Sequence, residues 1–287
     1  MIVRERPNAL QLFFVLRGSL IPRIWPQLLG VAAVSALVVA SHRVAPDLVP
    51  DVSQAPFALV GVALSIFLSF RNSASYDRWW EARRLWGGII RTARDLARQS
   101  LILDDGTGAV SADRRALLMD VIAFAAALAR QLRGEGAGAA EARLGAIAGR
   151  IAALTRSGRL TDIQALLLHQ SLERLSQAAV GCERLANTPL PFAYTLLLHR
   201  TAYLFCFILP FGLADALGWL TPLAAALVAY TYFGLDALGE ELEEPFGLEP
   251  NDLPIAAYAT VLEIDLRRAL GETDLPEAPR PVNYQLT

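Results

Sequence analysis

The sequence predicts an all-α membrane protein that has four transmembrane helices and a helical cytosolic domain. Hydrophobic residues make up 54% of the 287 residues and the mean hydropathy is +0.38, a high value for a soluble protein. Four apolar stretches are candidates to cross a lipid bilayer, and the second of them, Pro56–Phe70, is marginal in length on its own. The polar stretches between them have helical periodicity, and none shows the period-two alternation of a half-buried strand.

The N-terminal segment, residues 1–23, is expected at the membrane surface or in the cytosol. Its Asn8–Leu20 part is typical of an amphipathic surface helix, and a helix packed on a soluble body is the alternative. The uncharged run Ile24–Ala40 is long enough to span the bilayer, and Trp25 suits an anchor at the interface. A polar loop over residues 42–50 ends this span.

The second apolar run, Pro56–Phe70, leads into a stretch that contains no signal for a helix to stop. Residues 71–97 have no proline, and the pair Gly87–Gly88 is the only weak point. We therefore expect transmembrane helices 1 and 2 within residues 24–71, and the second of them continues from the membrane into the cytosol.

Residues 72–190 predict the cytosolic helical domain, in which glycines mark turns between helices and apolar residues recur at helical spacing. The clearest stripe comprises Leu117, Leu118, Val121, Phe124, Leu128 and Leu132. Transmembrane helices 3 and 4 are expected within residues 191–239. A cytosolic helix, around Pro254–Leu270, and a proline-rich tail belong to the C-terminal segment, residues 240–287.

The arginines set the expected topology, because positively charged loops stay in the cytosol. They cluster before the first span and again over Arg71–Arg98, whereas the two short loops between paired spans hold few. This distribution places both termini and the middle domain in the cytosol. Asp236, near the end of the fourth span, either caps a neighbouring helix or pairs with an arginine.

The sequence carries no enzyme motif and no pattern typical of a cofactor site. Its three histidines are far apart in the chain, so a histidine-based metal or catalytic site is not expected. The acidic segment Glu240–Glu249 offers oxygens for Ca²⁺, but Pro245–Gly247 divides it and a solvated turn is favoured. The net charge of −2 gives no basic field for nucleic acid.

The second span carries the most informative pattern for function. Val62, Ile66 and Phe70 lie at i, i+4 and i+8 and therefore share one helix face. A ring of such helices would surround an axis with three apolar tiers, and constrictions of this kind gate by dewetting. On spacing alone, ordinary packing of these side chains against other helices is favoured over a role in gating. Asn72 and Ser73 follow the stripe and would line a wetter space beyond it.

Two further patterns lie close to the expected membrane ends. Arg78, Trp79 and Trp80 form a dense aromatic and basic patch together with the residues that follow them, Glu81, Arg83, Arg84 and Trp86. Such a patch is typical of a membrane-interface belt with cation–π partners. Pro189–Pro191 forms a rigid joint ahead of the third span and keeps Leu190 out of a helix. On spacing alone, a plain link between two helices is the favoured interpretation of this joint.

Three segments resemble the bestrophin family, and in particular its bacterial branch. They are Gly61–Gly87 (GVALSIFLSFRNSASYDRWWEARRLWG), Cys182–Tyr194 (CERLANTPLPFAY) and Asp236–Gly247 (DALGEELEEPFG). The similarity runs over essentially the whole chain in order, and the pair of motifs R-W-W and P-F-G is fairly specific.

This resemblance implies a homopentameric ion channel of a bacterial inner membrane, with membrane lipid and permeant inorganic ions as partners and no cofactor. It implies a pore neck formed by Val62, Ile66 and Phe70 on a pore helix, residues 56–71. For these three residues it favours a gate over plain packing. It also implies a second constriction at the cytosolic exit, and Leu190, which precedes a proline, matches that position.

The resemblance leaves two properties open. Animal members bind Ca²⁺ through a run of aspartates directly after P-F-G, whereas this chain has Leu248–Asp252 (LEPND) there, which makes activation by Ca²⁺ doubtful. Animal members conduct chloride, and the bacterial branch implies monovalent cations, which we take as the expectation. The alternative function is a membrane-anchored helical scaffold that docks a cytosolic partner, and a stable monomer would favour it.

Overall fold

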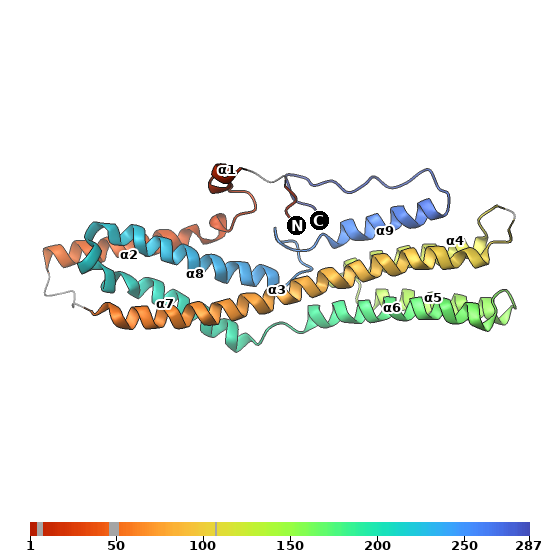
Figure 1. Ribbon diagram of the computed structural model, residues 1–287, viewed down its shortest axis with the longest axis horizontal. Helices are drawn as coiled ribbons and strands as arrows, with labels where there is room; N and C mark the ends of the chain where they lie inside the picture. Colours follow the sequence, from red (N-terminus) through yellow and green to blue (C-terminus); the bar gives the residue numbers. More distant parts are fainter. Residues whose placement is uncertain (5–7, 46–51, 107) are drawn as a thin grey trace. The chain divides into compact units, whose positions relative to one another are not determined.

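The structure is a computed structural model that describes residues 1–4, 8–45, 52–106 and 108–287, and its main elements are helices (Figure 1). In the described part of the chain, β-structure is limited to the isolated bridges Ile2–Gln285 and Val282–Gln285. The all-α prediction is therefore confirmed. The helices, in chain order, are α1 (Ala9–Phe13), α2 (Ile21–Val44), α3 (Gln54–Gln99), the 3-10 helix η2 (Ser100–Leu103), α4 (Ala112–Leu132), α5 (Ala139–Arg156), α6 (Asp162–Asn187), α7 (Phe192–Leu217), the 3-10 helix η3 (Gly218–Leu220), α8 (Thr221–Glu243) and α9 (Ile255–Ala269).

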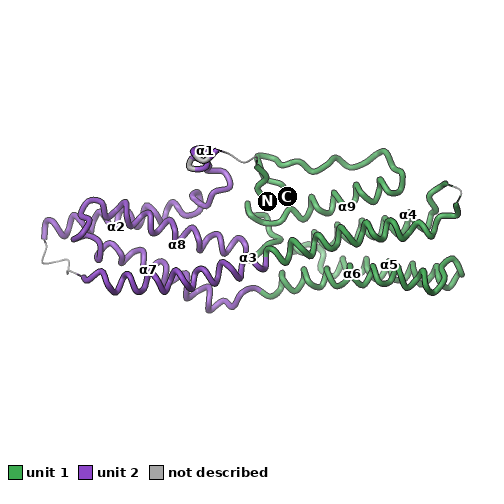
Figure 2. The backbone as a smooth tube through the Cα atoms, viewed as in Figure 1, with its two compact units in different colours: residues 1–4, 79–188, 244–287 green, residues 5–78, 189–243 purple. Residues whose placement is uncertain are grey.

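The chain divides into two compact units, coloured green and purple in Figure 2. Unit 1 comprises residues 1–4, 79–188 and 244–287, and unit 2 comprises residues 5–78 and 189–243. Helix α3 contributes to both units, because its 46 residues continue without a break. The prediction of one long helix beyond the second apolar run is confirmed.

Unit 2 contains α2, α7, α8 and the first part of α3. Small residues of α3 permit close contact with the other helices: a Cβ added at Gly61 would lie 3.1 Å from the Phe205 ring. The Ser65 hydroxyl lies 2.9 Å from the Tyr232 hydroxyl, which in turn donates to the Gly61 carbonyl at 2.8 Å. Small and hydroxyl-bearing residues are the typical means of helix association in a membrane, where apolar burial gives little driving force.

Among the residues that the structure describes, three helical stretches are long and apolar enough to cross a membrane: Ile21–Val44, Gln54–Leu103 and Phe192–Glu243. The third stretch holds two helices, α7 and α8, separated by η3. Gly218 begins this turn with a φ of +52°, a backbone angle that favours glycine. The four apolar runs of the sequence thus correspond to α2, the first part of α3, α7 and α8.

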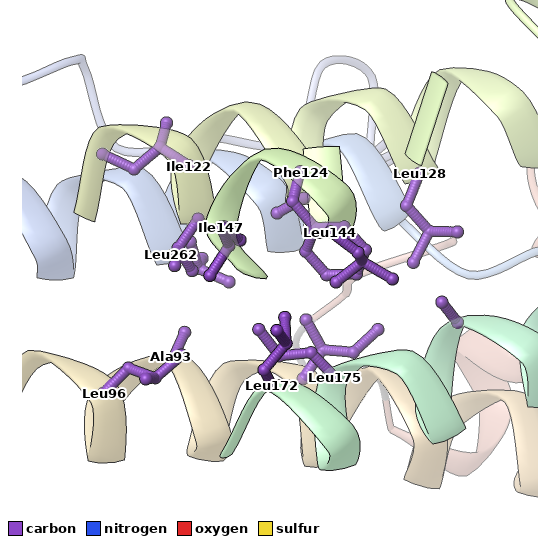
Figure 3. Packing of buried hydrophobic residues seen from close by; sticks show 14 of the residues in the cluster. Ala93, Leu96, Ile122, Phe124, Leu128, Leu144, Ile147, Leu172, Leu175 and Leu262 are labelled. Atoms are coloured by element: carbon purple, nitrogen blue, oxygen red, sulfur yellow. The ribbon is translucent and has the colours of Figure 1, made fainter. Parts of the chain in front are cut away.

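Unit 1 is a helical bundle formed by the second part of α3 with α4, α5, α6 and α9. Figure 3 shows its core, where apolar side chains from these helices interdigitate. Phe124 and Leu128 of α4, Ile147 of α5 and Leu168 of α6 have no solvent-exposed surface. The predicted apolar stripe on α4 is therefore a core face, as its helical period requires.

The start of α4 is fixed by a small polar network in unit 1. The Ser111 hydroxyl caps the helix by accepting from the Arg114 backbone N–H at 3.1 Å. The buried Arg114 guanidinium donates to Asp104 at 2.7 Å and to the Ala269 carbonyl of α9 at 3.1 Å. The Ser111 N–H and this guanidinium hold the pKa of Asp104 below its usual value, so the carboxylate stays charged.

The structure corrects one prediction near the N-terminus. The surface helix expected over Asn8–Leu20 is only five residues long, because α1 ends at Phe13 and Gly18 adopts a φ of +81°. A one-turn helix is too short to present a continuous apolar face. Helix α2 also begins earlier than expected and includes His42 and Arg43, which the sequence placed in a loop, and residues 46–51 of that loop lie outside the described residues.

Candidate functional site

One face of the first part of α3 is left exposed by the residues that the structure describes. Val62, Ile66 and Phe70 are 62%, 50% and 63% exposed, whereas Leu64 and Leu68 are buried against the rest of unit 2. At 100° per residue, the two leucines lie on the opposite side of the helix from the three exposed residues. The apolar stripe is therefore not buried by the described part of the chain.

Exposure alone does not set these three residues apart, because Leu59, Val60 and Phe67 of the same helix are exposed as well. Two open grooves run along α3 in this region. One, of about 600 Å³, is bordered by Val62 and Ile66 and by Phe205 of α7. The unpartnered surface of α3 is thus broad and includes the predicted stripe.

The second groove, of about 680 Å³, gathers polar side chains just beyond the stripe. Asn72 and Ser73 line it together with Ser65 and Ser69 of α3 and with Leu235 of α8. The Asn72 amide donates to the Leu68 carbonyl at 2.9 Å. The two residues that the sequence assigned to a wetter space therefore border an open, partly polar groove.

A buried ion cluster joins α3, α7 and α8 within unit 2. The Arg71 guanidinium, 1% exposed, donates to the Asp236 carboxylate and lies 3.8 Å from that of Glu243. The His199 ring Nδ1 lies 2.7 Å from the other Asp236 oxygen. The prediction that Asp236 pairs with an arginine is confirmed. Charges at such depth are tolerated only when they are paired, so the cluster fixes how these three helices meet.

The acidic residues in the last turn of α8 also have basic partners. The Arg23 guanidinium contacts Glu240 at 2.5 Å and Glu241 at 3.5 Å. Arg78 Nε donates to the Glu243 backbone carbonyl at 3.1 Å. These carboxylates are therefore largely neutralised by arginine, which agrees with a structural role for the segment.

The tryptophan patch is divided between two environments. Trp86 is completely buried in the unit 1 core beside Tyr258, and Trp79 packs on the same core and donates to the Asn251 carbonyl at 2.9 Å. Only Trp80 presents a largely exposed ring. The interpretation as a membrane-interface belt is wrong for Trp86, because a Trp ring with no exposed surface serves as core.

Leu190 lies in unit 2, at the start of α7. Its side chain is half-buried, and its backbone N–H donates to the Glu243 carboxylate at 3.0 Å. Since Glu243 also lies close to Arg71, the joint is tied to the ion cluster. The role of Leu190 as a constriction at the cytosolic exit stays a prediction.

Sequence reasoning missed the most deeply buried charge of the site. Arg71 was grouped with the arginines that set the topology, whereas the structure buries it against carboxylates 165 and 172 residues further along the chain. The available signal was its place directly after the apolar run, where an unpaired charge is costly.

The chain was compared with known proteins. The family model described as bacterial/fungal bestrophin protein matches residues 1–147 and 137–268. A voltage-dependent anion channel-forming protein of Mesorhizobium japonicum, mll4386, is 48% identical over 293 residues, which cover 95% of this chain and 93% of that protein. The voltage-dependent anion channel-forming protein YneE of Escherichia coli K12 is 39% identical over 309 residues, and both chains are covered completely.

A solved structure also matches. The crystal structure of a bacterial bestrophin homolog from Klebsiella pneumoniae has a TM-score of 0.82 and 36% sequence identity to this chain. The match covers 87% of this chain and 99% of that one. The likeness therefore extends over both the apolar and the polar helices.

The ion cluster yields a test of what holds α3 in place. Replacing Arg71 with leucine leaves the carboxylates of Asp236 and Glu243 buried without their guanidinium. We expect a loss of about 3–5 kcal/mol, the usual effect of breaking a buried pair from one side. The measurement is the thermal unfolding of the detergent-solubilised protein, followed by circular dichroism. The double variant Arg71→Leu/Asp236→Leu should recover part of the loss.

Arg91→Leu is the matched control, because Arg91 is exposed on the same helix and has no ion-pair partner among the described residues. Its effect should stay within about 0.5 kcal/mol. Equal losses for Arg71→Leu and Arg91→Leu would contradict the assignment of the cluster as a structural lock.

Proposed function

This chain belongs to the bacterial and fungal bestrophin family, and from that membership we propose that it is one subunit of a homopentameric channel for small monovalent ions. Its relatives are named as channel-forming proteins and not as enzymes, which agrees with the lack of an enzyme motif in the sequence. In the proposed assembly, four helices of each subunit cross the bacterial inner membrane and both termini lie in the cytosol.

The observation that carries this proposal is the unpartnered apolar face of α3. Five copies of α3 with Val62, Ile66 and Phe70 turned towards the axis would form three apolar tiers. Eight residues at about 1.5 Å each separate the first tier from the last, so the neck would be about 12 Å long. An apolar passage of this length can expel water and stop ions until it widens.

The grooves beside this face support the oligomer. Together they leave apolar residues of α8 such as Val228, Leu235 and Leu242 open beside α3. Contiguous apolar surface of this kind usually marks an interaction site. In the proposed ring, the neighbouring subunit would cover these grooves and hold α3 against the axis.

An exposed charge on the same face of α3 as the neck favours cations. Asp77 follows Phe70 by seven residues, about two helical turns, and therefore projects in nearly the same direction. It is exposed and lines the polar groove with Ser73. Five copies would form a ring of carboxylates just inside the neck, a device that concentrates cations. The relatives, in contrast, are named as anion channel-forming proteins, and these names favour anion selectivity.

The neck makes a direct prediction for conductance. Replacing Val62, Ile66 and Phe70 together with alanine widens the passage and lowers the barrier to water. We expect a several-fold larger single-channel conductance, or a larger open fraction, when the purified protein is recorded in planar bilayers.

The matched control replaces Val60 and Phe67 with alanine. Both are exposed apolar residues of the same helix, but they project roughly 60–160° away from the three neck residues. Their replacement should leave the unit conductance near the wild-type value. An unchanged current in the triple variant, or an equal gain in the control, would count against the neck.

Reversal potentials in asymmetric potassium chloride decide the sign of the permeant ion. We expect the sign that corresponds to cation selectivity, and Asp77→Asn should move the reversal potential towards zero, because it removes five carboxylates from the path. Asp274→Asn, which alters a carboxylate outside α3, should leave it in place. A wild-type reversal potential of the opposite sign would establish anion selectivity, as the names of the relatives suggest.

A further inference from the structure

A third open groove, of about 470 Å³, lies in unit 1 between α3 and α6. It is distinct from the neck and is lined largely by polar and charged residues. Its volume falls in the range of small-molecule sites, about 300–1,000 Å³. The residues around it are Glu81, Arg84, Leu85, Gly88, Arg91, Thr92, Arg174, Gln177 and Ala178.

The groove is open because small residues lie where two antiparallel helices would otherwise fill it. The helices are held at both ends of the groove, by the Ser171–Gln99 hydrogen bond of 2.9 Å and by the Arg184–Glu81 ion pair. Between these contacts, a Cβ added at Gly88 would meet no atom within 4 Å. The floor is formed by the buried residues Thr92 and Ala178.

Three arginines surround the groove without carboxylate partners. Arg84, Arg91 and Arg174 are exposed, and none forms an ion pair with another described residue. Two acids close to them in the chain pair with other arginines: Glu81 accepts from Arg184, and Asp95 accepts from Arg98. Three uncompensated guanidinium groups around one hollow repel one another, so this surface is suited to binding an anion.

We propose that this groove is a binding site for a small multivalent oxyanion, a phosphate- or carboxylate-bearing solute of the cytosol. The planar guanidinium donates two parallel hydrogen bonds to such groups, whereas a single chloride would leave most of the volume empty. Because α3 provides Arg84 and Arg91 and α6 provides Arg174, one ligand can contact both helices.

The inference rests on the proposed function in one point, namely that the groove faces water in the assembled channel. Gly88 follows Phe70 by 18 residues, which is five helical turns, so both positions share one face of α3. Arg84 and Arg91 lie within about 60° of that face. If the neck face lines the axis, these arginines line the aqueous space on the cytosolic side.

Isothermal titration calorimetry of the purified oligomer with inorganic pyrophosphate tests the proposal without any need for ion conduction. We expect saturable binding that weakens as sodium chloride is raised. Arg91→Gln and Arg174→Gln should each weaken binding by about tenfold, the effect of one lost charged hydrogen bond.

Two matched variants separate a built site from general charge attraction. Arg143→Gln removes an exposed arginine of α5 away from the groove and should leave the affinity unchanged. Gly88→Leu fills the groove without removing a charge and should abolish binding, whereas Gly88→Ala should keep most of it.

Binding that survives Gly88→Leu, or that falls equally in Arg143→Gln, would overturn the proposal. So would the absence of saturable binding to an intact oligomer. If the protein binds pyrophosphate but gives no current, the oxyanion site is supported and the channel function is refuted. If it gives currents but does not bind pyrophosphate, the channel function is supported and the oxyanion site is refuted.

Discussion

The structure depends on a division of helix α3 into two opposed faces. One face is buried along the helix, from Leu64 and Leu68 to Trp86 and Leu96, and holds α3 in both units. The other face carries the exposed stripe, Asp77 and, further along, Arg84 and Arg91 of the groove between α3 and α6. Because α3 buries one face against its own chain, the opposite face is the one left for contacts outside it.

The buried ion cluster fixes the register of α3 against α7 and α8. Arg71 places a charge one residue after the apolar stripe, and Asp236 of α8 and His199 of α7 hold it there. Apolar side chains allow small shifts along a helix, whereas a buried ion pair is satisfied at one register only. The register of Phe70 is therefore set by its neighbour, and through Glu243 the same cluster fixes the position of Leu190.

Much of the fold was predictable because glycines, prolines and helical periodicity are local signals. They located α4, α5, α6 and α9 and the unbroken course of α3. The pairing of Arg71 with Asp236 was not predictable in this way, since it depends on how α3 and α8 pack, and neither was the buried position of Trp86. The groove between α3 and α6 was not predicted for the same reason: Arg174 and Arg91 line it together only because α6 packs beside α3.

The central claim is that the face of α3 bearing Phe70 borders water on the symmetry axis. Modification of a Phe70→Cys variant by a charged, water-soluble thiol reagent during bilayer recording tests it most directly. The background is low, because Cys182 and Cys206 are buried and burial raises the pKa of the Cys182 thiol to about 12. The account predicts that the reagent alters the current through Phe70→Cys and leaves that through Phe67→Cys unchanged. An unreactive Phe70→Cys, or equal effects at both positions, would contradict it.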